Sequence, residues 1–147
     1  MRRLLPPVVV LVLFACLAVL WNFHPSGFAM RPERGLPWEF PLIVGMMLLM
    51  AARWQFVRSK AEINTFRTPA TFVTSGLFRF SRNPMYLGFV LLLTAAAMFV
   101  NLWCALAAPL AFIAACSFWY IPHEERNMRG AFGAAYDDYA WRVRRWL

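Results

Sequence analysis

The sequence is poor in the residues that build disulfides and metal centres. It has only 3 cysteines and 2 histidines in 147 residues. Cys16, Cys104 and Cys116 each lie within an apolar stretch, and no two of them have the CxxC spacing of a redox or zinc motif. His123 has no second metal ligand at helical spacing. We therefore predict three small core residues, and neither a disulfide framework nor a metal site.

Charged residues are also scarce, and acidic ones most of all. Charged side chains make up 15% of the chain and apolar ones 61%, whereas soluble domains average about 25% and about 45–50%. The 7 acidic residues all fall at the ends of the apolar runs or outside them. Small membrane transporters usually carry an acidic residue in mid-membrane. The sequence therefore disfavours a transporter.

Four apolar runs dominate what is present, at residues 4–21, 36–52, 84–100 and 102–121. A helix needs about 20 residues to cross a hydrocarbon core of ~30 Å, and the second and third runs are short by that measure. Buried strands can also be continuously apolar, but they rarely exceed about 8 residues. We therefore predict an all-α integral membrane protein, with residues 1–147 forming a single domain of four transmembrane helices.

The basic residues are distributed unevenly among the connections between these runs. The second connection and the C-terminal tail are rich in arginine, whereas the first connection has only Arg31 and Arg34, offset by Glu33. By the positive-inside rule, both termini and the second connection are predicted to be cytoplasmic, as in a bacterial inner membrane protein. The net charge of +8 then reflects topology and attraction to anionic headgroups. Nucleic-acid binding explains the charge less well, because no basic face stands apart from the membrane.

The third and fourth runs predict a tight helical hairpin. The turn around Asn101 is very short, and alanines crowd both runs. Small residues let helix backbones approach closely in lipid. A hairpin returns the chain to the side that it left. We therefore expect Arg82-Asn83 and Glu124-Glu125 to lie on the same, cytoplasmic, side.

Two further segments do not have the character of membrane spans. Residues 57–83 mix Thr, Ser, Pro and Arg with four phenylalanines, which is too apolar for disorder and too polar to span. We expect this segment to be a cytoplasmic loop folded against the membrane. The tail after Glu124 is amphipathic, and we expect an interfacial C-terminal helix with Tyr136 and Tyr139 as anchors at headgroup depth.

The motif Arg82-Asn83-Pro84-x-Tyr86 has an ordinary structural interpretation. Pro84 starts a helix and Asn83 caps it. Arg82 snorkels to the interface, and Tyr86 belongs to an aromatic belt. Taken alone, the motif is more consistent with helix initiation than with a binding site.

Glu124-Glu125 is harder to explain in structural terms. Adjacent carboxylates at a cytoplasmic membrane surface repel each other and the anionic lipid, unless a cationic group pairs with them. Arg126 and Arg129 could supply that charge. A cationic ligand is the alternative, and the sequence leaves both open at this point.

Taken together, these motifs resemble those of the isoprenylcysteine carboxyl methyltransferase family and its phospholipid-methyltransferase relatives. The resemblance covers about residues 60–147, in the order and spacing of that family. The matching elements are Val73-Thr74-Ser75-Gly76, Arg82-Asn83-Pro84-x-Tyr86-x-Gly88, a helical hairpin, Glu124-Glu125, Phe132-Gly133-x-x-Tyr136-x-x-Tyr139, and a closing Arg145-Trp146.

The resemblance implies a methyltransferase that uses S-adenosyl-L-methionine, built in the membrane without a Rossmann domain. Consistently, the sequence has no GxGxxG motif after a strand. In such relatives, the loop before the hairpin, the start of its first helix and a Glu after it hold the cofactor. Carried over, the cofactor contacts are Ala70, Thr71, Phe72, Val73, Phe78, Asn83, Pro84, Met85, Tyr86 and Glu124. Arg82 and Glu125 lie beside them and are the candidate catalytic residues.

These residue types suit the chemistry of S-adenosyl-L-methionine. An arginine can bind its carboxylate in a bidentate manner. A glutamate can bind its ammonium or its ribose hydroxyls, and aromatic rings can face its sulfonium. The enzyme then chiefly aligns the reactants and excludes water. A carboxylate acceptor needs no general base, whereas an amine or thiol must lose a proton, which His123 or Glu125 could take.

One position departs from the family pattern. In the branch that methylates prenylated cysteine, an arginine associated with the substrate stands four residues before the cofactor Glu, and here that position is Tyr120. The expected acceptor is therefore a lipidic or small molecule, and its identity stays open. Two alternatives to a methyltransferase remain, a membrane reductase of related fold that uses a nicotinamide cofactor and a non-catalytic four-helix membrane scaffold.

Overall fold

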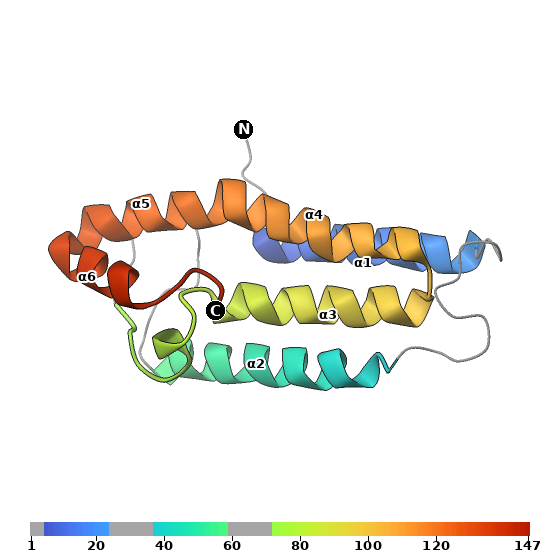
Figure 1. Ribbon diagram of the computed structural model, residues 1–147, viewed down its shortest axis with the longest axis horizontal. Coiled ribbons are helices and arrows are strands. Elements are labelled where there is room, and N and C mark those ends of the chain that lie inside the picture. Colours follow the sequence, from blue (N-terminus) through green and yellow to red (C-terminus); the bar gives the residue numbers. More distant parts are fainter. Residues whose placement is uncertain (1–4, 24–36, 59–71) are drawn as a thin grey trace.

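The computed structural model describes residues 5–23, 37–58 and 72–147, and all regular structure in these ranges is helical (Figure 1). This confirms the predicted all-α class. The α-helices are α1 (Pro6–Phe23), α2 (Glu39–Arg58), α3 (Pro84–Val100), α4 (Ala107–Ala115), α5 (Ile121–Phe132) and α6 (Ala134–Arg142). Three short elements join them, the 3₁₀ turns η2 (Gly76–Arg79) and η3 (Trp103–Leu106) and the π-helical turn η4 (Cys116–Tyr120).

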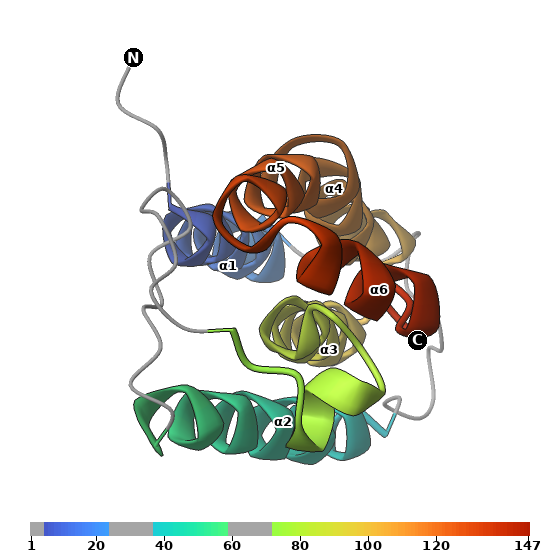
Figure 2. The ribbon, with the colours of Figure 1, turned by 90° about the vertical axis from the view of Figure 1, so that its left-hand side faces the viewer.

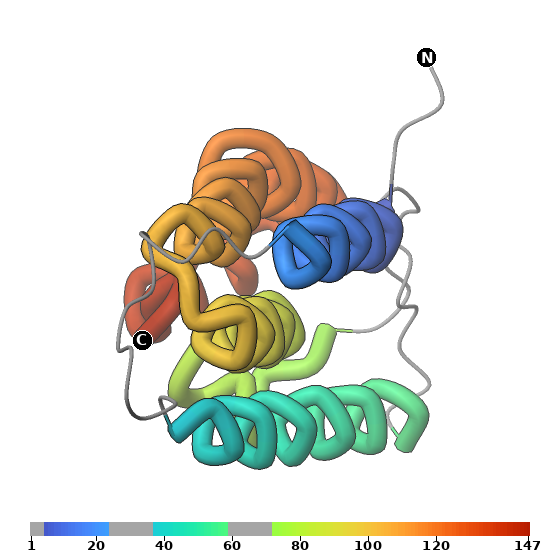
Figure 3. The backbone as a smooth tube through the Cα atoms, turned by 90° about the vertical axis from the view of Figure 1, so that its right-hand side faces the viewer, coloured from blue at the N-terminus to red at the C-terminus, as the bar shows by residue number. Residues whose placement is uncertain are grey.

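Helix α3 lies at the centre of the bundle. Viewed from either end, it has α2 on one side and α1 and α4 on the other (Figures 2 and 3). The main core forms where α3 meets α1 and α4, around fully buried side chains such as Leu93, Phe112 and Cys116. Because α3 contacts all three neighbouring helices, the segments that precede and follow it, η2 and η3, start from the middle of the bundle.

Within the described ranges, three helical segments are long and apolar enough to cross a bilayer, Pro6–Phe23, Glu39–Arg58 and Trp103–Phe132. They correspond to the first, second and fourth predicted spans. Helix α3, the third, has 17 residues, or roughly 25 Å of helix, which is shorter than a hydrocarbon core of ~30 Å. The chain is thus a helical membrane protein with three candidate spans and one shorter apolar helix.

The last long helix differs from its prediction. The amphipathic part after Glu124 was expected to turn along the interface, but the helical segment runs on from Trp103 to Phe132, through η4. Its 30 residues extend over roughly 45 Å, more than a hydrocarbon core requires. Consequently α5, which carries the polar residues, projects beyond the ends of α2 and α3 (Figure 1).

The chain reverses after α5. Gly133 has a φ of +52°, a conformation that side-chain-bearing residues rarely adopt, and α6 begins directly after it. Tyr136 and Tyr139 then point into the protein, where they pack with Phe72 and Phe132. Their predicted role as headgroup anchors is therefore wrong. The reason is that α6 folds back over the segment before α3, so the side of α6 that carries the two tyrosines is buried against this segment.

Helices α2 and α3 approach closely at a pair of glycines. A Cβ atom added at Gly45 would lie 2.9 Å from Leu91 Cβ and 3.0 Å from the carbonyl oxygen of Gly88. Neither atom belongs to the far end of a flexible side chain, so only separation of the helices could relieve the clash. Small residues at this crossing thus allow the contact between the two backbones.

We predict that Gly45→Ala destabilises the protein by about 1–3 kcal/mol, the usual cost of overpacking. In a thermal melt of the purified protein in detergent, this corresponds to a midpoint lower by several degrees. Gly130→Ala is the matched control, because no atom lies within 4 Å of a Cβ added there. That control is expected to melt at or slightly above the wild-type temperature, since alanine is the better helix former. Equal midpoints for the two variants would contradict the close contact.

Candidate functional site

The hairpin brings the beginning of α3 and the beginning of α5 together. Asn101 ends α3 in a left-handed conformation (φ 59°), and its N–H donates to the carbonyl oxygens of Ala97 and Met98. The returning helix packs along α3. Arg82 Nη1 thereby lies 3.0 Å from Glu125 Oε1. The expected juxtaposition of the two polar clusters is confirmed.

Glu125 is the centre of a cluster of arginines. Its carboxylate receives two parallel hydrogen bonds from Arg145, with Nε 2.8 Å from Oε1 and Nη2 2.8 Å from Oε2. Arg82 also bonds Oε1, and Arg129 Nη1 lies 3.9 Å from Oε2. The Glu125 side chain is only 7% exposed. Removing a carboxylate from water costs free energy. Here the three nearby guanidinium groups, and the two parallel hydrogen bonds from Arg145, offset that cost.

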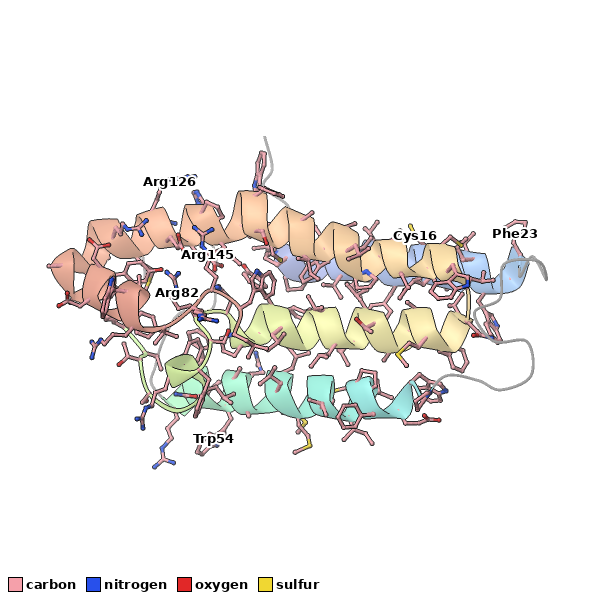
Figure 4. The ribbon with its side chains drawn as sticks, in the orientation of Figure 1. Cys16, Phe23, Trp54, Arg82, Arg126 and Arg145 are labelled. Carbon is pink, nitrogen blue, oxygen red and sulfur yellow. The ribbon has the colours of Figure 1, made fainter. Side chains whose placement is uncertain are left out.

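Arg82 is oriented inward, so its predicted snorkelling is wrong. The side chain is 12% exposed, and Nη1 donates to the hydroxyl of Tyr136 at 3.4 Å as well as to Glu125. Its Nε is buried and has no hydrogen-bond partner among the described residues. Buried donors are rarely left unpaired. The Nε group is thus available to an acceptor supplied by a ligand. Figure 4 shows Arg82 and Arg145 at the same end of the bundle.

Tyr86 of α3 and Glu124 of α5 form a second pair beside this cluster. The Tyr86 hydroxyl donates to Glu124 Oε1 at 2.6 Å, a short distance typical of a bond to a carboxylate. The ring of Tyr86 is buried, with its centroid 6.2 Å from that of Phe112 and 6.4 Å from that of Tyr120. A carboxylate thus lies at the edge of an aromatic cluster, between α3 and α5.

The segment before α3 is folded against both α2 and α6. Gln55 of α2 bonds the carbonyl oxygen of Ser75 and accepts from the N–H of Leu77 at 3.2 Å. The hydroxyl of Tyr139 donates to the carbonyl oxygen of Phe78 at 2.7 Å. Phe72 stacks on Phe132, with ring centroids 5.1 Å apart. The folded character predicted for this loop is confirmed for residues 72–83, and its contact with the membrane stays a prediction. Residues 59–71 lie outside the described ranges.

The predicted cofactor contacts fall into separate groups. Ala70 and Thr71 lie outside the described residues, while Phe72 and Val73 begin the folded segment. The ring of Phe78 packs against Phe56 of α2, with ring centroids 5.1 Å apart. Asn83, Pro84, Met85, Tyr86 and Glu124 lie around the beginning of α3, and Arg82 and Glu125 adjoin them.

Asn83 does not cap α3 through its side chain. Its Nδ2 donates instead to the carbonyl oxygen of Arg145 at 2.9 Å, and its own N–H is bonded by Ser81 Oγ at 3.1 Å. Asn83 thus occupies the predicted N-cap position, but its side chain makes no capping bond, because its amide is turned toward the C-terminal residues. Arg145, Ser81 and Tyr136 are site residues that the sequence did not assign. Arg145 stood in the closing Arg145-Trp146 element and Tyr136 in the Phe132-Gly133-x-x-Tyr136-x-x-Tyr139 element, whereas Ser81 had no signal.

The tyrosines at this end of the protein remain protonated. Burial raises the pKa of Tyr139 well above its ordinary value. Burial also raises the pKa of Tyr136, although the hydrogen bond from Arg82 acts in the opposite direction. Both hydroxyls therefore act as neutral hydrogen-bonding groups. The hydrogen bonds to Glu125 in turn raise the pKa of Arg145, which keeps its charge.

His123 lies on α5, one helical turn before Asn127. Within the described part of the chain, no group of three His, Cys, Asp or Glu side chains could hold a metal ion. His123 Nε2 instead lies 3.4 Å from Nδ2 of Asn127 on the same helix. The imidazole is half-buried one residue from Glu124.

The sequence comparisons agree with this geometry. The family model described as phospholipid methyltransferase matches residues 40–135, well over half of the chain. The chain therefore belongs to the phospholipid methyltransferase family, in the same group as the isoprenylcysteine carboxyl methyltransferases, and the predicted resemblance is confirmed. Searches of curated proteins and of solved structures found no match. The family match includes Arg82, Tyr86, Glu124 and Glu125, and it ends in the first turn of α6.

The two adjacent glutamates are expected to respond differently to neutralisation. Glu125→Gln leaves the buried Arg82 without its countercharge, which costs roughly 2–4 kcal/mol. The variant should melt several degrees below wild type in detergent. Glu124→Gln should melt close to wild type, because a glutamine carbonyl can still accept the bond from Tyr86. Glu124→Gln melting at or below Glu125→Gln would contradict the central place of Glu125 in the cluster.

Proposed function

We propose that the protein is a membrane-embedded methyltransferase that uses S-adenosyl-L-methionine to methylate a lipidic or small acceptor. The observation that carries the proposal is the arrangement at the start of α3, in a chain that belongs to the phospholipid methyltransferase family. A carboxylate paired with a tyrosine (Glu124 and Tyr86) lies near a buried arginine with an unpaired Nε (Arg82). That the protein is a methyltransferase follows from its family, whereas its use of S-adenosyl-L-methionine is our inference.

The donor set of the site fits this cofactor. Arg82 Nε is a buried donor that lacks an acceptor among the described residues, and the carboxylate of the methionine moiety is such an acceptor. Glu124 suits the ammonium group or the ribose hydroxyls. The rings of Tyr86 and Tyr120 offer faces to a sulfonium. Ala70, Thr71, Phe72 and Val73, with the backbone at Phe78, are proposed to cover the adenosine, and Asn83, Pro84 and Met85 to line the entrance to α3.

The cofactor supplies an already activated methyl group, so the protein has little covalent chemistry to perform. Its residues orient the reactants and exclude water from the aromatic cluster around Tyr86. For an amine or thiol acceptor, a base must take one proton. Both oxygens of Glu125 are held by arginines, which makes this carboxylate a poor base. His123 is therefore the better candidate of the two.

We propose that the bound methyl acceptor places no anionic group of its own next to Tyr120. Tyr120, which stands where the family pattern has its substrate arginine, is buried there against Tyr86. A phospholipid headgroup amine is the first acceptor to test, in keeping with the name of the family. Small thiols and prenylated acceptors are the next candidates.

We further propose that the site faces the cytoplasm, in a membrane of the bacterial inner type. Arg82, Arg126 and Arg145 lie at one end of the bundle and Phe23 at the other (Figure 4). Arg53, Arg58 and Arg79 come from elements that end on the same side as Arg82. Such an end favours the cytoplasmic face and its anionic lipids. All four apolar helices are proposed to cross the membrane, α3 within a shell formed by the other three.

The cofactor assignment can be tested by calorimetric titration of the detergent-purified protein with S-adenosylhomocysteine, which cannot be turned over. We expect saturable binding that Glu124→Gln and Arg82→Ala each weaken by roughly tenfold or more, since each removes a charge-assisted contact. Asp138→Asn is the control, because Asp138 is exposed on α6. Its affinity should equal that of wild type.

A parallel titration with a reduced nicotinamide dinucleotide distinguishes the alternatives. Binding of the dinucleotide instead of S-adenosylhomocysteine would support the related reductase and overturn the proposal. Binding of neither compound by well-folded protein would favour the non-catalytic scaffold. Unchanged affinity in Glu124→Gln would remove Glu124 from the site while retaining the cofactor.

A further inference from the structure

The last five residues, 143–147, form a segment that we name the C-terminal strap. The chain leaves α6 in extended conformation at Val143 (φ −118°, ψ 130°) and ends beside the beginning of α3 (Figure 1). The strap lies beyond the family match, which ends at residue 135. The match therefore gives no information about its role.

The strap is bonded to the backbone and side chains at the start of α3. The N–H of Arg82 donates to the carbonyl oxygen of Arg144 at 3.0 Å. The carbonyl oxygen of Arg145 accepts from Asn83 Nδ2 at 2.9 Å and from Ser81 Oγ at 3.4 Å. These bonds hold the strap directly against the residues that precede the helix.

The strap is also attached to the returning helix. The guanidinium of Arg145 binds both oxygens of Glu125 in α5. Trp146 Nε1 donates to Ser117 Oγ in η4 at 3.3 Å. The same five residues thus bridge the beginning of α3 and the helix that carries Glu124, two segments that are otherwise held by the Arg82–Glu125 pair and the Tyr86–Glu124 pair.

The contacts of Glu125 form a chain from the strap to Arg82. Arg145 fixes the plane of the carboxylate through its two parallel bonds, and Oε1 of that carboxylate also binds Arg82 Nη1. Without Arg145 the carboxylate could rotate about its side chain, and Arg82 would follow it. The direction of the unpaired Arg82 Nε therefore depends on a residue that does not itself lie beside the Tyr86–Glu124 pair.

We propose that Arg145 is a positioning residue, which acts through Glu125 to aim Arg82 into the ligand site; this inference rests on the proposed function. Glu125 is then a positioning residue as well, and not the catalytic residue that the sequence indicated. Its two oxygens are engaged by arginines of the protein. Arg82 and Glu124 remain as the charged groups that face the ligand.

The first test measures S-adenosylhomocysteine affinity by calorimetry in Arg145→Gln, Arg145→Lys and Arg144→Gln. Arg145→Gln should bind roughly ten- to a hundredfold more weakly, because small displacements of a positioning group have effects of that size. Arg145→Lys should recover part of the loss, since it keeps the charge but not the fork. Arg144→Gln makes the same charge change on an exposed neighbour and should bind like wild type. Equal affinities of Arg145→Gln and Arg144→Gln would overturn the proposal.

A double-mutant cycle distinguishes positioning from general stabilisation. If Arg145 acts on the ligand through Arg82, adding Arg145→Gln to Arg82→Ala should cause no further loss of affinity. Full additivity of the two losses would mean that Arg145 acts independently of Arg82, and it would overturn the proposal. The Arg145 side chain is 45% exposed, so Arg145→Gln is expected to fold and to permit the comparison.

Hydrogen exchange followed by mass spectrometry provides a readout that needs no ligand. The N–H of Arg82 is protected by Arg144 of the strap. A peptide containing Arg82 should therefore exchange faster in Arg145→Gln than in wild type or in Arg144→Gln. If the wild-type protein fails to bind S-adenosylhomocysteine, the proposed function is wrong, and hydrogen exchange alone then tests the role of Arg145 in the strap. Identical exchange in all three proteins would overturn that role.

Discussion

The polar end of the protein depends on one buried carboxylate. Glu125 is acceptable in its position only because Arg82, Arg145 and Arg129 come from three separate segments to surround it. Arg82 and Arg145 are in turn oriented by Glu125, whereas Arg129 bonds Asp137 at 2.9 Å. The interaction therefore joins the start of α3, the polar extension of the last long helix and the C-terminal strap. Separating the start of α3 from this helix would leave Arg82 and Glu125, both largely buried, without each other's charge.

The two adjacent glutamates differ in the side chains that they contact. Glu125 is directed toward guanidinium groups of the protein, whereas Glu124 is directed toward the aromatic cluster of Tyr86, Phe112 and Tyr120. On a helix, consecutive side chains point in directions about 100° apart, so two neighbouring carboxylates can face a structural cluster and a ligand site. This separation explains how two like charges are accommodated next to each other. Glu125 thereby holds the arginines beside it, and Glu124 is the carboxylate that we propose to bind the cofactor.

Much of the fold could be predicted because a bilayer restricts the possibilities. Long apolar runs must become helices there, and the short turn at Asn101 could only return the chain along itself. The proximity of Arg82 and Glu125 followed from that hairpin alone. The direction of the C-terminal part did not follow, because an amphipathic pattern is equally compatible with a helix at an interface and with one that packs on protein. Tyr136 and Tyr139 were assigned to headgroups for this reason, and they are in fact buried against Phe72 and Phe132.

The sequence by itself determined the class of protein, the helical bundle and the family, since composition, run length and the ordered motifs are properties of the chain alone. Only the tertiary structure decided which charges pair. Arg82 and Arg145 are 63 positions apart, and the sequence contains no periodicity that relates them, yet one carboxylate binds both. Arg126 and Arg129 stood closer in sequence and were the partners that the sequence offered. Arg129 does lie 3.9 Å from Glu125 Oε2, whereas Arg126 is exposed. Such pairings depend on how the elements pack. A buried charge must be paired, and its partner is the opposite charge that the packing brings within hydrogen-bond distance.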